Sequence, residues 1–150
     1  MNLGVSTLDL PPLGQLPHHL GFAVADLDAS MASVGDELGL TWREPVRDWV
    51  ADFRTAAATV RWQLSHVKST GDNGLVIELL QGAAGTTWYA PHGIAFHHYA
   101  FAPADRAHHH AALLASGWSV DLIRDVVDAA TSSFGYYTRP GSPRVELCQP

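Results

Sequence analysis

Two histidine pairs and two glutamates occur at corresponding places in the two halves of the sequence. Residues 18–26 and 97–105 share a paired histidine, a Phe-Ala and an Ala-Asp in one register. Each is followed by a second shared pattern, with Glu78 in the segment VIELLQ and Glu146 in the segment RVELCQ. Imidazoles and carboxylates are ligands of divalent transition metals, so one histidine and one glutamate from each copy would supply four ligands.

Self-similarity of this kind indicates two diverged copies of one module. The copies are offset by 79 residues at the histidines (98 − 19) and by 68 at the glutamates (146 − 78), so the second copy is shorter between these landmarks. A chain of 150 residues is one domain of ordinary size, and the two modules must then share one core. We expect an arm of residues 1–17 and a single domain of residues 18–150, with modules at about 18–82 and 93–150 and a linker at about 83–92.

Composition excludes several classes of protein. The formal net charge is −6, and one lysine and scattered arginines form no basic stripe, which argues against a nucleic-acid partner. Cys148 is the only cysteine, so no intrachain disulfide can form and a reducing compartment is expected. No apolar run approaches the roughly 20 residues that span a bilayer, and no secretory signal pattern follows Met1. We therefore expect a cytoplasmic protein without a membrane partner.

The first module predicts a strand, a helix and further strands. Residues 19–25 suit a short strand, and Asp26 is placed to cap a helix that ends at Gly39. The apolar residues at helical spacing between them are Leu27, Met31, Val34 and Leu38. Strands are expected within residues 40–61 and, by alternation, over 60–68, and the turn sequence GDNG then leads into a return strand at 75–81. On that strand Glu78 faces away from Ile77 and Leu79.

The second module repeats this order. A strand at residues 97–103 precedes Asp105 as helix cap, a helix runs through Leu113, and strands are expected at 120–127, 133–138 and 144–149. His108, His109 and His110 are consecutive helical residues that point about 100° apart, so they predict a solvated face and not a metal site. Two modules give eight strands and two helices. We predict an α+β fold in which a curled sheet surrounds a cleft and the helices cover its outer faces.

These segments resemble the vicinal oxygen chelate superfamily, which includes glyoxalase I, methylmalonyl-CoA epimerase, ring-cleaving dioxygenases and bleomycin resistance proteins. The resemblance covers residues 18–149 and is greatest to the epimerase-like glyoxalase branch, in the segments HLGFAV, IELL, HYAF and VEL. It implies paired βαβββ modules forming an open, eight-stranded curled sheet around a metal-binding cleft. It also implies that one divalent metal ion is bound by four residues, namely His19, Glu78, His98 and Glu146.

Two alternatives remain open from the residues themselves. Strand alternation sends His18 and His97 to the face opposite their neighbours, and a slip of one residue would exchange them for His19 and His98 as ligands; the resemblance selects the second of each pair. The histidines could also be satisfied core residues, with the glutamates paired to arginines such as Arg144.

Two imidazoles and two carboxylates suit Co, Ni, Mn, Zn or Fe and leave coordination positions open for water or substrate. The chain departs from the epimerase, because near Arg61 and Gln63 it has no carboxylate that could serve as a second base. It also has no evident basic cluster for the carboxylates of glutathione, as glyoxalase I would need.

The favoured function is a metal-dependent isomerase, epimerase or lyase acting on a small carbonyl, thioester or other enolisable substrate. Glu146 or Glu78 would move the proton. A second hypothesis is a sequestering, resistance-type protein, and a third is an Fe(II) ring-cleaving dioxygenase. Stacking surface for a small-molecule ligand would come from four aromatic residues, namely Trp62, Trp88, Tyr136 and Tyr137. We expect a homodimer.

Overall fold

The computed structural model describes residues 16–74, 76–124 and 132–149. The first module contains β1 (His19–Val24), α1 (Leu27–Leu38), β2 (Val46–Thr55), β3 (Thr59–Lys68) and β4 (Ile77–Gly82). The second contains β5 (Ile94–Phe101), α2 (Arg106–Ala115), β6 (Ser119–Arg124), β7 (Phe134–Thr138) and β8 (Val145–Cys148). Each module therefore has the order βαβββ, as the repeat predicts.

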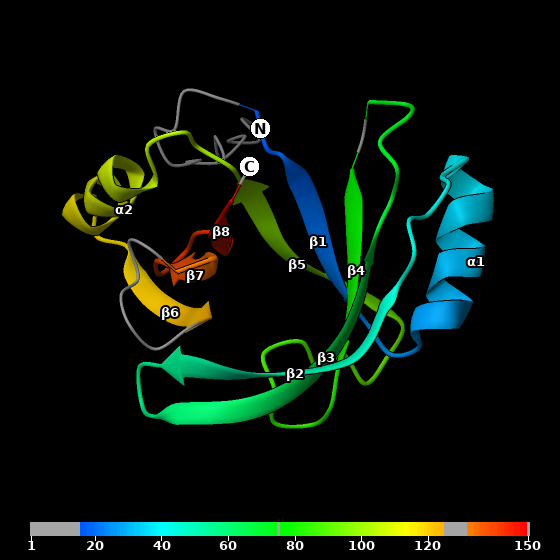
Figure 1. Cartoon of the computed structure of the whole chain (residues 1–150), viewed down its shortest axis with the longest axis horizontal. Coiled ribbons are helices and arrows are strands. Elements are labelled where there is room, and N and C mark those ends of the chain that lie inside the picture. The colour runs from blue at the N-terminus through cyan, green and yellow to red at the C-terminus, as the bar shows by residue number, and fades with distance from the viewer. Residues whose placement is uncertain (1–15, 75, 125–131, 150) are drawn as a thin grey trace, which may run out of the picture.

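The eight strands form one mixed sheet that closes on itself in the order β1-β4-β3-β2-β6-β7-β8-β5 (Figure 1). Antiparallel pairing joins the modules at two seams, one between β1 and β5 and a shorter one where Phe53, Arg54 and Thr55 of β2 pair with β6. The predicted eight-stranded, curled sheet is confirmed. It is closed rather than open, because the three residue pairs between β2 and β6 complete the ring.

Local sequence signals account for the helices that cover the outside of the barrel. The Asp26 side chain accepts a hydrogen bond from the backbone N–H of Ala29 at the start of α1, and Gly39 ends that helix with φ of 65°, a left-handed conformation that glycine adopts without strain. Asp105 caps α2 in the same way through the N–H of His108. Both predicted N-caps are confirmed.

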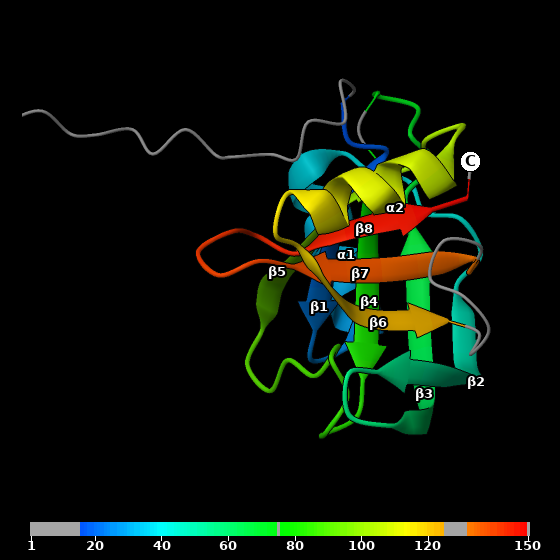
Figure 2. The same cartoon turned by 90° about the vertical axis from the view of Figure 1, so that its left-hand side faces the viewer.

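Each helix packs on its own half of the sheet (Figures 1 and 2). Beneath α1, Leu27 packs with Ile77 and Leu79 of β4. Beneath α2, Leu113 packs with Leu147 and other buried residues of the second module. A third cluster, which includes Phe53, lies inside the barrel. Because the helices bury the outer faces, the inner faces are left to line a cavity.

The register of the two modules is the same, and this places their chemistry in equivalent positions. Glu78 of β4 pairs with Gly21 of β1, which lies two residues after His19. Glu146 of β8 pairs with Ala100 of β5, which lies two residues after His98. Residues two apart in a strand point to one face, so histidine and glutamate share the inner face in both modules. Each module therefore contributes one histidine and one glutamate to the inner face of the sheet.

Several sequence predictions differ from the structure in detail or cannot be compared with it. The first strand of the second module, predicted at residues 97–103, begins earlier in the structure, since β5 starts at Ile94. The α2 histidines are not all solvated: His110 contacts the hydroxyl of Tyr137 at 2.7 Å through Nδ1, and only His108 is exposed. Most of the predicted arm, Leu75 and the end of the strand predicted at 120–127 lie outside the described residues.

Candidate metal centre

Four side chains meet inside the barrel, and they are the four that the resemblance selects. His19, Glu78, His98 and Glu146 each offer one donor atom, and these atoms all lie within 4.8 Å of one another. The four residues come from β1, β4, β5 and β8, which are neighbours in the sheet. All four are buried, with 6 % or less of their surface exposed.

The distances between the donor atoms suit a small divalent ion. His19 Nε2 lies 3.1 Å from Glu78 Oε2, 3.5 Å from Glu146 Oε2 and 3.3 Å from the Nε2 atom of the other imidazole. His98 Nε2 lies 3.5 Å from Glu78 Oε2 and 2.7 Å from Glu146 Oε2. Metal–ligand bonds of about 2.0–2.2 Å put neighbouring ligand atoms about 3.0–3.5 Å apart. The four atoms could therefore surround one ion.

A buried oxygen without a hydrogen bond also fits this interpretation. Glu146 Oε2 has no hydrogen-bond partner of good geometry within the described part of the chain, although it lies close to His98 Nε2. Buried carboxylate oxygens normally accept a hydrogen bond or bind a cation. Arg144, which the alternative reading pairs with the glutamates, instead contacts Asp121 at 3.3 Å through Nε. The donor set is therefore one that an ion could satisfy.

The neighbouring histidines support the two inner imidazoles. His18 Nδ1 lies 2.9 Å from His19 Nδ1, and His97 Nδ1 lies 2.8 Å from His98 Nδ1. In both pairs the Nδ1 side of the inner ring is held, and its Nε2 atom is left to face the carboxylates. A hydrogen bond to the second nitrogen is the usual way to fix the orientation and tautomer of a metal-binding histidine.

His97 is buried, contrary to the alternation of a regular strand. The pairing of β1 with β5 shifts register between Gly21 and Phe22: Gly21 pairs with His98 but Phe22 pairs with Phe96. His97 is thus the extra residue of a β-bulge, which allows adjacent side chains to lie on similar sides of the sheet. Both His97 and His98 pack against the ring of Tyr136, the first edge-on and the second tilted, each with ring centroids 5.1 Å apart.

Electrostatics in the cluster keep protons on the imidazoles and negative charge on the carboxylates. Burial disfavours a charged His98, but the negative charges of Glu146 and Glu78 outweigh burial and raise the pKa of His98 to about 9. The pKa of His19 is raised against burial by the same two carboxylates. Burial would raise the pKa of Glu146, but the charge of His98 and the contacts with both imidazoles hold it at about 2. The pKa of Glu78 is also held well below its usual range.

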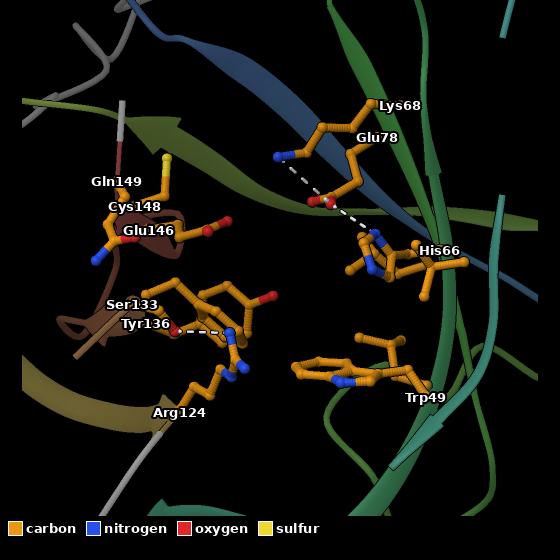
Figure 3. Close-up of a pocket in the computed structure, with 14 residues that line it drawn as sticks. Trp49, His66, Lys68, Glu78, Arg124, Ser133, Tyr136, Glu146, Cys148 and Gln149 are labelled. Carbon is orange, nitrogen blue, oxygen red and sulfur yellow. Dashed lines mark hydrogen bonds and ion pairs between the residues drawn. The ribbon is translucent and has the colours of Figure 1, made fainter. Parts of the chain in front are cut away.

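A cavity of about 380 Å³ adjoins the cluster, with Glu78 and Glu146 in its wall (Figure 3). Glu78 contacts both the histidines of the cluster and two other residues that line the cavity. Its Oε2 atom faces the histidines, whereas Oε1 lies 3.4 Å from His66 Nδ1 and 3.8 Å from Lys68 Nζ. Substrate in the cavity would thus contact the cluster directly.

Only one of the four aromatic residues predicted to bind substrate lines this cavity. Tyr136 does so, and its hydroxyl accepts a hydrogen bond of 3.0 Å from the indole N–H of Trp88. Trp88 is completely buried behind it, and Trp62 packs on Trp88 with ring centroids 5.8 Å apart. Tyr137 lies on the other face of β7, in the core beneath α2. Its predicted role as a substrate contact does not fit that position, because adjacent strand residues face opposite ways.

Other cavity residues were not predicted from the sequence. His66, Lys68, Trp49 and Arg124 all line the cavity. The alternation of residues 60–68 already placed His66 on one face with Leu64, and this face proves to be the inner one. Arg124 and Trp49 carried no comparable signal, since their strands belong to different modules and meet only in the closed barrel.

Comparison with known proteins agrees with the fold. The chain is similar in structure to a Streptomyces coelicolor methylmalonyl-CoA epimerase variant in complex with 2-nitronate-propionyl-CoA, with a TM-score of 0.59, 21% identity, and coverage of 89% of this chain and 92% of the other. It is also similar to the Mycobacterium tuberculosis methylmalonyl-CoA epimerase, with a TM-score of 0.54, 16% identity, and coverage of 88% and 85%. A search of curated proteins gives no significant match.

Identities this low establish a shared fold and leave the reaction open. Within the described residues, no helix is long and apolar enough to cross a membrane. A family model described as "Glyoxalase/Bleomycin resistance protein/Dioxygenase superfamily" matches residues 18–137, which is most of the sequence and includes parts of both modules. The chain therefore belongs to the glyoxalase, bleomycin resistance protein and dioxygenase superfamily, also called the vicinal oxygen chelate superfamily.

Proposed function

We propose that this protein is a divalent-metal-dependent isomerase or lyase that moves a proton next to a carbonyl group of a small substrate. The observation that carries the proposal is the convergence of His19, Glu78, His98 and Glu146 at the wall of the cavity. A structural metal site is normally closed to solvent by four ligands, often cysteines, whereas this set borders a space that a ligand can enter. Two imidazoles and two carboxylates suit Co, Ni, Mn, Zn or Fe as the ion.

A divalent ion at this site would supply Lewis acidity, which polarises a carbonyl oxygen and makes the adjacent C–H more acidic. The two glutamates would transfer the proton. Among the described residues that line the cavity, Glu78 and Glu146 are the only carboxylates. Arg61 and Gln63 point away to surface partners, Asp52 and Asp48 respectively, so no base comes from that part of β3.

The surroundings of Glu78 favour it for proton transfer on the β4 side of the cavity. His66 and Lys68 face its Oε1 atom, so a proton taken up there would lie within reach of a second titratable group. Glu146 approaches from β8, on the other side, as Figure 3 shows. A substrate held between them could lose a carbon-bound proton to one of these glutamates, and the same glutamate would return that proton to the same or a neighbouring carbon.

The size of the cavity supports a small substrate. A volume of about 380 Å³ is near the lower end of the range for ligand pockets, which is roughly 300–1,000 Å³. Trp49, Phe134 and Leu80 give it apolar walls, against which the carbon chain of a substrate could pack.

Metal-dependent exchange of a carbon-bound proton tests the proposal. The purified protein is analysed for bound metal, and a panel of 2-oxo acids, 3-oxo acids and acyl thioesters is followed by proton NMR in D₂O with loaded and metal-stripped protein. We expect deuterium to enter next to the carbonyl of at least one compound, only with the ion present, and at least 100-fold more slowly in Glu146→Gln. Stoichiometric binding of a panel member without exchange would favour a sequestering protein. The absence of metal after purification and reconstitution would refute the proposal.

A further inference from the structure

We propose that the substrate carries a carboxylate at the end opposite its reacting carbonyl, and that Arg124 binds this group. The inference rests on the proposed function in that it places the carbonyl at the metal centre. Arg124 is the last residue of β6 and lines the same cavity as Glu78 and Glu146. In Figure 3 its side chain reaches into the cavity opposite Trp49.

The Arg124 guanidinium is held in place, and no carboxylate of residues 16–74, 76–124 or 132–149 neutralises its charge. It stacks over the indole of Trp49 at 4.8 Å from the ring centroid, and Nη1 donates a hydrogen bond of 3.2 Å to Ser133 Oγ. No carboxylate in the described residues forms an ion pair with it, whereas Arg47 and Arg61 each pair with an aspartate. A half-buried cation fixed by an aromatic ring and a neutral hydroxyl keeps most of its five N–H donors for a ligand.

The strand register sets the distance between Arg124 and the metal centre. Leu122 of β6 pairs with Tyr136 of β7, which pairs with Glu146 of β8, so these three residues form one row across the sheet. Arg124 lies two residues further along β6. The separation of its Cα atom from that of Glu146 is therefore about 7 Å along the strands and about 10 Å across them. Because both side chains line one cavity of about 380 Å³, a ligand that contacts both must be a small molecule.

The other cation of the cavity does not offer the same site. Lys68 lies on the opposite wall, with Nζ 3.8 Å from Glu78 Oε1, so its charge offsets that carboxylate. A guanidinium also presents parallel N–H groups that match the two oxygens of a carboxylate, which an ammonium group does not. Arg124 is thus the group in the cavity wall best suited to select for a carboxylate.

Binding of simple acids to the full chain tests this inference. Glutarate has a carboxylate at both ends of a three-carbon chain, and butyrate has the same three-carbon chain with a carboxylate at one end only. Both are titrated calorimetrically into the metal-loaded wild type, into Arg124→Met and into Arg61→Met, which removes a surface arginine that pairs with Asp52. We expect glutarate to bind about 10- to 100-fold more weakly to Arg124→Met and almost unchanged to Arg61→Met. Butyrate should change by less than about threefold in either variant.

Three results would overturn the assignment: glutarate affinity unchanged in Arg124→Met, an equal loss for butyrate, or an equal loss in Arg61→Met. If 4-phosphonobutyrate binds clearly more tightly than glutarate, the group that Arg124 binds is phosphate-like and the assignment of a carboxylate is wrong. The same titrations with metal-stripped protein separate this inference from the proposed function. If no ion binds but the affinity for glutarate still falls in Arg124→Met, the anion site is supported and the proposed function is wrong. If proton exchange occurs but the affinity for glutarate is unchanged in Arg124→Met, only the anion site is wrong.

Discussion

Binding of a metal ion should release protons, because the ion and the protons compete for the same nitrogen atoms. In the metal-free protein the carboxylates of Glu146 and Glu78 raise the pKa of His98 to about 9 against the effect of burial. At pH 7 this imidazole is therefore protonated on both ring nitrogens. The nitrogen that faces the cluster is Nε2, and in this state it has no free lone pair. An ion needs the Nε2 lone pair, so the proton must leave first.

The size of the effect follows from the pKa. The difference between pH 7 and a pKa of about 9 is two units (9 − 7 = 2), so the apparent metal affinity at pH 7 should be about 100-fold below its limit. It should rise about tenfold for each pH unit up to that pKa. His19, whose pKa is also raised, would steepen the dependence.

Competition with a coloured chelator at pH 6.5, 7.5 and 8.5 measures this slope, and calorimetry in two buffers of different ionisation enthalpy counts the protons. We expect at least one proton per ion. An affinity that does not vary over this range, with no proton released, would show that the imidazoles are neutral in the metal-free protein and that the electrostatic reasoning is wrong.

The same pair sets the pH range in which the metal-free protein is most stable. The pKa of His98 is raised from 6.5, so its stabilisation is complete below pH 6.5 and is lost as pH rises through about 9. The shift of 2.5 units (9 − 6.5) corresponds to about 3 kcal/mol. The pKa of Glu146 is lowered from 4.5 to about 2, so its stabilisation is present above pH 4.5 and is lost as pH falls through about 2. The pKa shifts of His98 and Glu146 arise from the same interaction, so their contributions to stability are not added together.

Thermal melts of metal-stripped protein should therefore show a maximum between about pH 4.5 and pH 6.5, with an alkaline loss that bound metal removes. Gly21→Ala should weaken metal binding at least tenfold in the chelator assay, because a Cβ atom there would collide with the ring of His98; unchanged affinity would mean that the ring can move aside at no cost. His97→Ala should weaken it about 10- to 100-fold, in contrast to the small effect that strand alternation predicts, since His97 holds the Nδ1 side of His98; a change below threefold would leave the bulge without a role in metal binding. Tyr136→Phe should lower the stability to denaturant by about 1–3 kcal/mol, because the buried N–H of Trp88 loses its acceptor; an unchanged midpoint would refute this hydrogen bond.

The sequence predicted the features that depend on spacing along the chain. The duplicated patterns around His19 and His98 revealed the repeat. The periodicity after Asp26 located the first helix, and the repeat with Asp105 as cap located the second. The resemblance then chose His19 and His98 over their neighbours as candidate ligands. The structure brings the Nε2 atoms of these two residues to 3.3 Å from each other.

Features that depend on how strands pair could not be obtained in this way. A regular strand would separate His97 from His98, but a bulge opposite β1 buries both, and nothing in the local sequence marks it. Likewise, alternation separates Tyr136 from Tyr137 without saying which of them faces inward. The pairing of Tyr136 with Glu146 decides this, because paired residues on neighbouring strands share a face.

The sequence by itself therefore determined the repeat, and the helices and their caps. With the family resemblance it also predicted a set of candidate ligands in two short segments of each module. Only the tertiary structure brought together groups from strands that are distant in the chain. Arg124 meets Trp49 because β6 pairs with β2 when the sheet closes, and Glu78 reaches Glu146 because each module turns the same face inward. The physical reason is that side-chain direction in a strand follows a local period of two, whereas the choice of neighbouring strand depends on burial summed over the whole barrel.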